Sequence, residues 1–176
     1  MPQRHPRPRP GHAPVRPASA PKDPTETLRG ILELTPAAPD PVTGQVRFTG
    51  TTPRQTRGRV FGGQVLAQSL AAASRTVPAA RSAHSLHGYF IRPGDALQPI
   101  TFTVETLRDG RSFSVRRVLA SQNEKAILAL TCSFQEPAGS ALDHQVAMPE
   151  GVPRPEDLPT TADVLGGINH PVAQEW

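Results

Sequence analysis

A pair of glycines leading into an alanine-rich segment constrains this chain more than any other feature. Residues 60–75 read VFGGQVLAQSLAAASR, and only Gln68 and Ser69 interrupt the apolar run from Val65 to Ala73. A surface helix carries one apolar stripe, so a helix this apolar must be covered on most of its sides. Four segments with the composition of strands follow it: residues 85–90, 100–107, 112–120 and 126–135. The sequence predicts an α+β fold, with a curled antiparallel sheet around one long central helix.

Shorter elements are expected before this helix. Residues 25–34 have apolar residues on one helical face behind a Thr25 N-cap, and Pro36 and the prolines after it end that helix. Residues 45–50 alternate apolar and polar side chains, which predicts a first strand.

Turn sequences separate the later strands. Residues 92–95 (RPGD) end the strand that begins at His84, and Asp109-Gly110 and residues 122–125 form the next turns. The last three strands are therefore expected to form an antiparallel meander. Within residues 100–107, alternation places Ile100, Phe102 and Val104 on one face. After residue 136, only a short helical turn near residues 162–165 is expected.

Composition divides the chain into a tail at residues 1–24, one domain at residues 25–137 and a linker-like tail at residues 138–176. Residues 1–24 are rich in Pro and Arg and too poor in large apolar groups to fold. This first tail is either a proline-rich ligand or a segment that binds nucleic acid. Alternatively, it is a dispensable extension or the result of a misassigned start codon. Residues 1–22 hold 5 of the 19 basic residues and no acid, so the net charge of +4 gives no reason to expect nucleic-acid partners.

The single cysteine, Cys132, lies in a strand-like run and is expected to pack as a small apolar group. One cysteine allows neither an internal disulfide nor a cysteine-rich metal site, which favours a reducing compartment. The N-terminus lacks the apolar stretch of a signal peptide, and no apolar run approaches the roughly 18 residues of a membrane span. The sequence therefore favours a cytoplasmic protein without membrane partner, metal or cofactor.

Five motifs carry a resemblance to a known family. They are residues 60–65 (VFGGQV), 84–90 (HSLHGYF), 92–95 (RPGD), 104–110 (VETLRDG) and 112–118 (SFSVRRV). In order and spacing they resemble the acyl-CoA thioesterase II (TesB-like) family over residues 25–149, which implies a hotdog fold. The resemblance also implies an acyl-CoA substrate, hydrolysed to fatty acid and coenzyme A.

Members of that family resemble two hotdogs fused in one chain, and only the first resembles this sequence. The family's Asp, Thr and Gln catalytic set belongs to the second hotdog and has no counterpart here. Single-hotdog enzymes generally place an Asp or Glu on or beside the central helix, whereas residues 60–80 contain none. We therefore expect half of a two-part enzyme that forms a homodimer or pairs with a second hotdog. The alternatives are a non-catalytic acyl-CoA binding or assembly module and a truncated, inactive fragment.

Gly62 and Gly63 are the candidate oxyanion site, because the first N–H groups of a helix lack partners within it and its dipole favours negative charge. A thioester can also approach a glycine closely. Alternatively, the glycines only form the turn and let the helix pack. Gln64 and Gln68 share one helical face, where their amides serve a binding groove or pair with sheet backbone.

His84 matches a histidine of the family's first hotdog and is the candidate catalytic residue, as a base or by holding its neighbours in place. Strand alternation places His87 on the opposite face, so only one of the two can point into a given site. Asp95 either presents a carboxylate near the groove or stabilises its turn.

Overall fold

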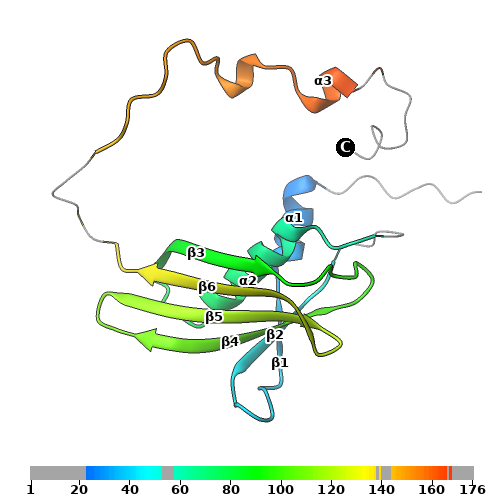
Figure 1. Ribbon diagram of the computed structural model, residues 1–176, viewed down its shortest axis with the longest axis vertical. Helices are drawn as coiled ribbons and strands as arrows, with labels where there is room; N and C mark the ends of the chain where they lie inside the picture. Colours follow the sequence, from blue (N-terminus) through cyan, green and yellow to red (C-terminus); the bar gives the residue numbers. More distant parts are fainter. Residues whose placement is uncertain (1–22, 53–57, 138, 140–143, 166, 168–176) are drawn as a thin grey trace, which may run out of the picture. The chain divides into compact units, whose positions relative to one another are not determined.

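The computed structural model describes residues 23–52, 58–137, 139, 144–165 and 167 (Figure 1). The chain divides into two compact units, one ending at residue 138 and the other beginning at residue 139. Residues 1–22 of the expected tail at residues 1–24 lie outside the described residues, and Pro24 is the first residue of helix α1. The expected domain limits stay predictions.

The first unit is built on an antiparallel sheet of six strands in the order β1-β2-β4-β5-β6-β3. Figure 1 shows β4, β5, β6 and β3 side by side in one curved sheet, against which α2 packs. The strands are Thr35–Ala37 (β1), Val46–Gly50 (β2), Ser82–Phe90 (β3), Ile100–Asp109 (β4), Phe113–Gln122 (β5) and Lys125–Gln135 (β6). The predicted meander is confirmed by the pairing of β4 with β5 and of β5 with β6.

Helix α2 spans Gly62–Ser74. Ala72 and Ala73 are completely buried, because their small side chains let the helix approach the sheet closely. Leu66 and Leu70 are half-buried and pack against the core, and Ala67 is half-buried as well. Part of α2 therefore stays accessible, so the sheet covers less of the helix than its apolar composition led us to expect.

The core lies between α2 and the inner face of the sheet. The predicted alternation in β4 is confirmed, since Ile100, Phe102 and Val104 are buried. The same period continues through β5 and β6, whose inward residues include Val118, Ala120, Leu128, Leu130, Cys132 and Phe134. Cys132 packs as a small apolar group, as predicted, and burial raises the pKa of its thiol to about 11.

The turn between β5 and β6 has only Asn123 and Glu124 between the paired residues Gln122 and Lys125. Both have positive φ values, 47° and 61°, as the two central residues of a type I′ hairpin turn require. This tight turn fixes the register of β5 and β6.

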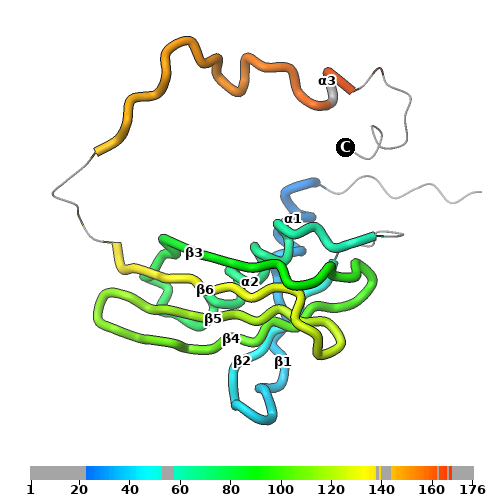
Figure 2. The backbone as a smooth tube through the Cα atoms, viewed as in Figure 1, coloured from blue at the N-terminus to red at the C-terminus, as the bar shows by residue number. Residues whose placement is uncertain are grey.

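The N-terminal elements differ from expectation in two ways. Helix α1 spans Pro24–Leu32, and Asp23 rather than Thr25 caps it, with the Asp23 carboxylate accepting the N–H of Thr25 at 2.9 Å. Pro36 does not simply follow the helix but lies in β1, opposite Phe48 of β2. Proline is tolerated there because β1 is an edge strand. Figure 2 shows the chain projecting from the sheet between β1 and β2.

Strand β3 carries a bulge that overturns one prediction. Its register against β6 shifts between Ala83 and Ser85, so His84 is an additional residue in β3 that has no paired residue in β6. His87 pairs with Thr131 on the outer face of the sheet, and His84 reaches Ser133 on that same face. The two histidines therefore share a face, because simple alternation fails across a bulge.

The second unit contains the short helix α3, Thr161–Leu165, at the expected place, and a 3-10 turn at Pro155–Asp157 that was not predicted. The Asp163 carboxylate accepts the Thr160 N–H at 2.8 Å, which closes the first turn of α3. No helix in the described part of the chain is long and apolar enough to cross a membrane.

Candidate functional site

The first turn of α2 presents two backbone N–H groups that the helix does not use. Phe61 is the N-cap, and its side chain makes no capping hydrogen bond. Its carbonyl accepts the N–H groups of Gln64 and Val65 at 3.0 and 3.3 Å, whereas Gly62 and Gly63 donate no backbone hydrogen bond to any described residue. The first turn also contains no acid. Two free donors and the positive end of the helix dipole thus coincide here.

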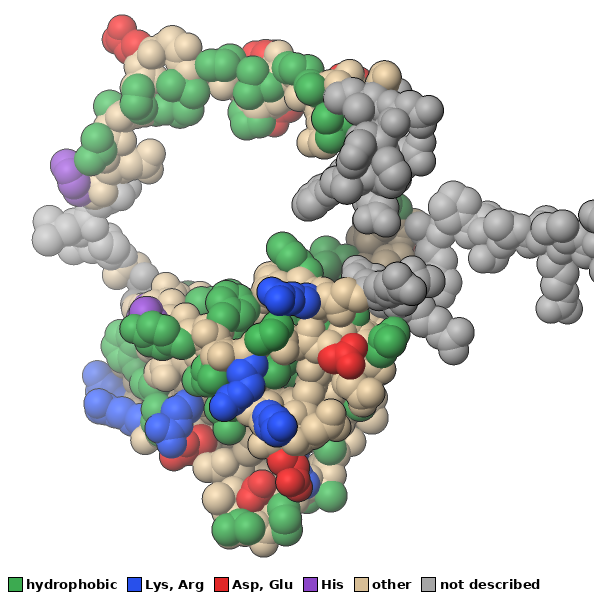
Figure 3. Space-filling model, turned by 45° about the vertical axis from the view of Figure 1, so that its right-hand side comes forward, with side chains coloured by type: hydrophobic (Ala, Val, Ile, Leu, Met, Phe, Trp, Pro, Cys, Tyr) green, Lys and Arg blue, Asp and Glu red, His purple; other side chains and the backbone are tan. Residues whose placement is uncertain are grey.

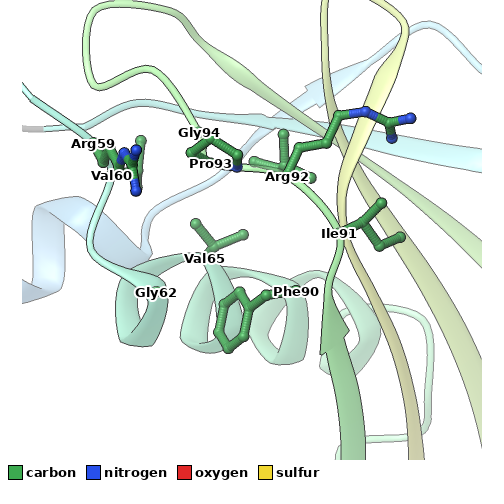
Figure 4. Close-up of a pocket in the computed structure, with 10 residues that line it drawn as sticks. Arg59, Val60, Gly62, Val65, Phe90, Ile91, Arg92, Pro93 and Gly94 are labelled. Atoms are coloured by element: carbon green, nitrogen blue, oxygen red, sulfur yellow. The ribbon is translucent and has the colours of Figure 1, made fainter.

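A cavity of about 310 Å³ lies beside this turn (Figure 4). Ten described residues line it: Arg59, Val60, Gly62, Val65, Phe90, Ile91, Arg92, Pro93, Gly94 and Ile127. Its walls are mainly aliphatic and aromatic, and its only charged lining side chains among the described residues are the two arginines. Such a pocket suits a ligand with an apolar part and an anionic part.

The arginines come from different sides of the cavity, and Figure 4 shows the Arg92 side chain extending away from Val65 and Phe90. Arg59 belongs to the segment that bridges to Asp95, where the Val60 N–H donates to the Gly94 carbonyl at 2.9 Å. Arg92 donates from Nη1 to the Ala126 carbonyl at 2.9 Å. Neither forms an ion pair with a carboxylate in the described residues, so both positive charges remain available to a ligand.

The two glutamines do not line this cavity. Gln68 is completely buried and donates to the carbonyls of Ile31 at 2.8 Å and Thr51 at 3.2 Å. Gln64 donates to the Thr52 hydroxyl at 3.2 Å and to the Gln68 side chain at 3.4 Å. Of the two interpretations, the structure favours pairing with backbone for Gln68, which fastens α2 to the end of α1.

Asp95 lies at the edge of the cavity, next to the lining residue Gly94. Its carboxylate accepts the Leu97 N–H at 2.9 Å, and its backbone exchanges two hydrogen bonds of 2.8 Å with the side chain of Gln122. This geometry is that of a turn-stabilising aspartate.

His84 is not brought together with the glycine pair. Its Nε2 lies 2.8 Å from the Ser133 hydroxyl, and its ring packs edge-on against Phe113 at 5.7 Å between centroids. Phe90, which lines the cavity, is six residues further along β3, or about 20 Å at the usual rise of a strand. His84 therefore lies on the outer face of the sheet, far from the first turn of α2.

Sequence reasoning assigned no role to Arg59 or Phe90, although both line the cavity. Phe90 could have been found from strand alternation, which places it with Leu86 and Gly88 on the face toward α2. Arg59 could not, because only the fold brings its loop beside the turn at residues 92–95. Among the described residues, no three His, Cys, Asp or Glu side chains gather as metal ligands would.

Comparisons with known proteins agree with the motifs. Residues 51–135 match the family model described as the acyl-CoA thioesterase N-terminal domain. Acyl-coenzyme A thioesterase 8 of Mus musculus is 44% identical over 131 residues, which are 74% of this chain and 39% of that protein. Acyl-CoA thioesterase 2 of Haemophilus influenzae is 50% identical over 100 residues, 57% of this chain and 34% of that protein.

Among solved structures, the tesB protein of Mycobacterium avium subspecies paratuberculosis matches with a TM-score of 0.62 and 40% identity, over 76% of this chain and 49% of that one. The chain thus spans less than half the length of these relatives. The six-stranded sheet with its central helix is a hotdog fold, as the resemblance implied. The chain carries the N-terminal hotdog domain of the acyl-CoA thioesterase II family.

Proposed function

We propose that this chain is an acyl-CoA thioesterase module whose site is the cavity at the start of α2. The proposal is supported mainly by the Gly62 and Gly63 N–H groups, which have no backbone partner among the described residues, beside an apolar cavity that is lined by Gly62 and edged by two arginines. An acyl-CoA needs all three features, since it joins an apolar acyl chain, a thioester carbonyl and a phosphorylated carrier.

In the proposed reaction, water adds to the thioester carbonyl carbon, and the carbonyl oxygen becomes an oxyanion that accepts the N–H groups of Gly62 and Gly63. Collapse of this intermediate breaks the carbon–sulfur bond and releases fatty acid and coenzyme A. The proton lost by the water goes to the leaving sulfur. Arg59 and Arg92 favour the negatively charged substrate over a neutral one.

The step also needs a base or an acceptor that orients the water. None of the described cavity residues carries a carboxylate, imidazole, hydroxyl or thiol side chain. We propose that a second hotdog supplies this group. The same observation favours the alternative function, an acyl-CoA binding module without hydrolysis, if no second hotdog joins the site.

Strand β3 is where a second hotdog would pair. One backbone edge of β3 pairs with β6, and no described strand pairs with the other edge. Its exposed side chains include Leu86, Tyr89 and Phe90, and hydrophobic groups are interspersed with arginine and lysine on the surface of this unit (Figure 3). Open edges of this kind recruit further strands. Analytical ultracentrifugation at micromolar concentration should detect a dimer, and a monomer would count against homodimerisation.

The lone Cys132 is buried and uncrosslinked, which supports a reducing compartment such as the cytoplasm as the place of action.

The function is tested by thiol release from acyl-CoA esters of several chain lengths, with a His84→Ala variant assayed beside the unchanged chain. In the dimeric protein, where a second hotdog is present, we expect turnover above the uncatalysed rate, retained in His84→Ala because His84 lies far from the cavity. Loss of turnover in a folded His84→Ala protein would mean that hydrolysis needs His84 and would contradict the proposed position of the site. No turnover in the folded dimer, together with measurable acyl-CoA affinity, would support the binding module instead.

A further inference from the structure

Two neighbouring aromatic residues end β3, and they point to opposite faces of the sheet. Tyr89 is 68% exposed and packs edge-on against His87, 4.7 Å away between ring centroids, on the outer face. Phe90 is 60% exposed and lies on the face toward α2, where it lines the cavity with Gly62 and Val65. Figure 4 shows its ring beside the first turns of α2. Of these two rings, Phe90 is therefore the one that can contact a ligand held at the glycine pair.

The ring of Phe90 is in close contact with Gly62. A Cβ built on Gly62 would lie 3.0 Å from two atoms of the ring. The space above this glycine is thus bounded by the ring, and no side chain fits between them unless the ring moves. A thioester oxygen bound by the Gly62 N–H places the carbonyl carbon, and the first acyl carbon attached to it, within a few ångströms of the same ring.

We propose that Phe90 determines specificity at the acyl carbon next to the thioester carbonyl. Its ring leaves room for a straight chain and excludes a methyl branch at that carbon, while the rest of the chain extends along Val65, Ile91 and Ile127. This inference rests on the proposed function, because it assumes that the carbonyl oxygen binds at the glycine pair. Phe90 thus selects unbranched acyl thioesters as ligands.

The test compares hexanoyl-CoA with 2-methylhexanoyl-CoA, which differ only by the branch. In Phe90→Ala, the ratio of kcat/KM for the branched over the straight substrate should rise about tenfold or more, as expected for one methyl group at an apolar wall. Phe90→Leu retains an apolar side chain and should give a smaller rise. Tyr89→Ala removes the neighbouring ring from the opposite face and should leave the ratio unchanged.

An unchanged ratio in folded Phe90→Ala, or an equal rise in Tyr89→Ala, would overturn the proposal. If the unchanged chain hydrolyses neither ester, the proposed hydrolysis fails, and the same pair is compared by calorimetric affinity. Tighter relative binding of 2-methylhexanoyl-CoA by Phe90→Ala than by the unchanged chain would then support the specificity role without turnover. Equal relative affinities in the two proteins would reject it.

Discussion

The two ends of α2 differ in how their polar groups are used. At the N-terminal end, Phe61 makes no side-chain cap, Gly62 lines an apolar cavity, and the N–H groups of Gly62 and Gly63 have no backbone partner among the described residues. At the C-terminal end, Thr76 donates to the Ala73 carbonyl from both its N–H and its hydroxyl. One end of the helix is left open to solvent and ligand, and the other is closed by hydrogen bonds.

The closed end is organised by Arg116, whose side chain is only 2% exposed. Its guanidinium donates to the carbonyl and hydroxyl of Thr76 at 2.8 and 2.9 Å and to the Asp109 carboxylate at 2.9 Å. Ser114 also donates to Asp109, at 2.6 Å, and Arg81 donates to Ser114. These groups link the chain that follows α2 to β4 and β5.

The difference indicates that one end of α2 anchors the helix and the other end is available to a ligand. The polar network holds α2 on the sheet from its C-terminal end, where positive charge also complements the helix dipole. The N-terminal end can then leave its N–H groups unpaired, because the position of the helix does not depend on them. Stability should therefore be sensitive to substitutions at one end and ligand chemistry to substitutions at the other.

The largest effect on stability is expected from Arg116→Ala. It removes a buried side chain and leaves the Thr76 carbonyl without its side-chain donor, while the half-exposed Asp109 carboxylate can be solvated, so the free energy of unfolding should fall by about 3 kcal/mol. Urea denaturation measures the change. Arg117→Ala is the matched control, because Arg117 is 58% exposed in a surface ion pair with Glu105, and it should cost less than about 1 kcal/mol. If both variants lost the same unfolding free energy, the network around Arg116 would not anchor α2 as proposed.

Gln68→Ala should have the next largest effect, because it removes the side-chain donor of the Ile31 carbonyl and the nearer of two side-chain donors to the Thr51 carbonyl. The Thr51 carbonyl keeps the Gln64 side chain as a donor, at 3.4 Å, so the loss in urea denaturation should come mainly from the Ile31 carbonyl and amount to about 1–3 kcal/mol. Gln64→Ala, one turn nearer the open end, should cost less, since Gln64 is only partly buried. A larger loss for Gln64→Ala would mean that the open end also carries stability.

Gly62→Ala should affect activity rather than stability. The added methyl group meets the Phe90 ring at 3.0 Å and crowds the approach to the N–H groups, so thioester hydrolysis should fall about tenfold or more. Gly30→Ala in α1 is the control, because a Cβ there meets nothing within 4 Å. Full activity in Gly62→Ala would contradict the placement of the substrate.

The smallest effect concerns pH. The hydrogen bond from Ser114, with the charges of Arg116 and Arg81, holds the pKa of Asp109 below its ordinary value. A lowered folded pKa means that the stabilisation is present above about pH 4 and is lost as the pH falls through the folded value. The difference in unfolding free energy between the unchanged chain and Asp109→Asn should therefore shrink below pH 4. A difference that stays constant down to pH 2 would contradict this role.

Local periodicity was enough to predict the central helix, the meander and the inward residues of β4. It was not enough for His84, because a bulge in β3 reverses the face that alternation assigns. The role of Arg116 was also missed, since a single arginine in a strand has no local pattern that marks it as buried. The glycine pair could be proposed from helix physics alone, but the cavity beside it depends on the pairing of residues 59 and 95, which are remote in sequence.

The most direct test of the difference between the two ends is a titration of the isotope-labelled chain with coenzyme A and with hexanoyl-CoA, followed by backbone amide NMR shifts. We predict that the resonances of Gly62 and Gly63 shift with hexanoyl-CoA, while those of Gly110 and Arg116 stay in place. Shifts confined to the Arg116 end, or to the outer face around His84 and Ser133, would contradict the proposal that the open end of α2 is the acyl-CoA site.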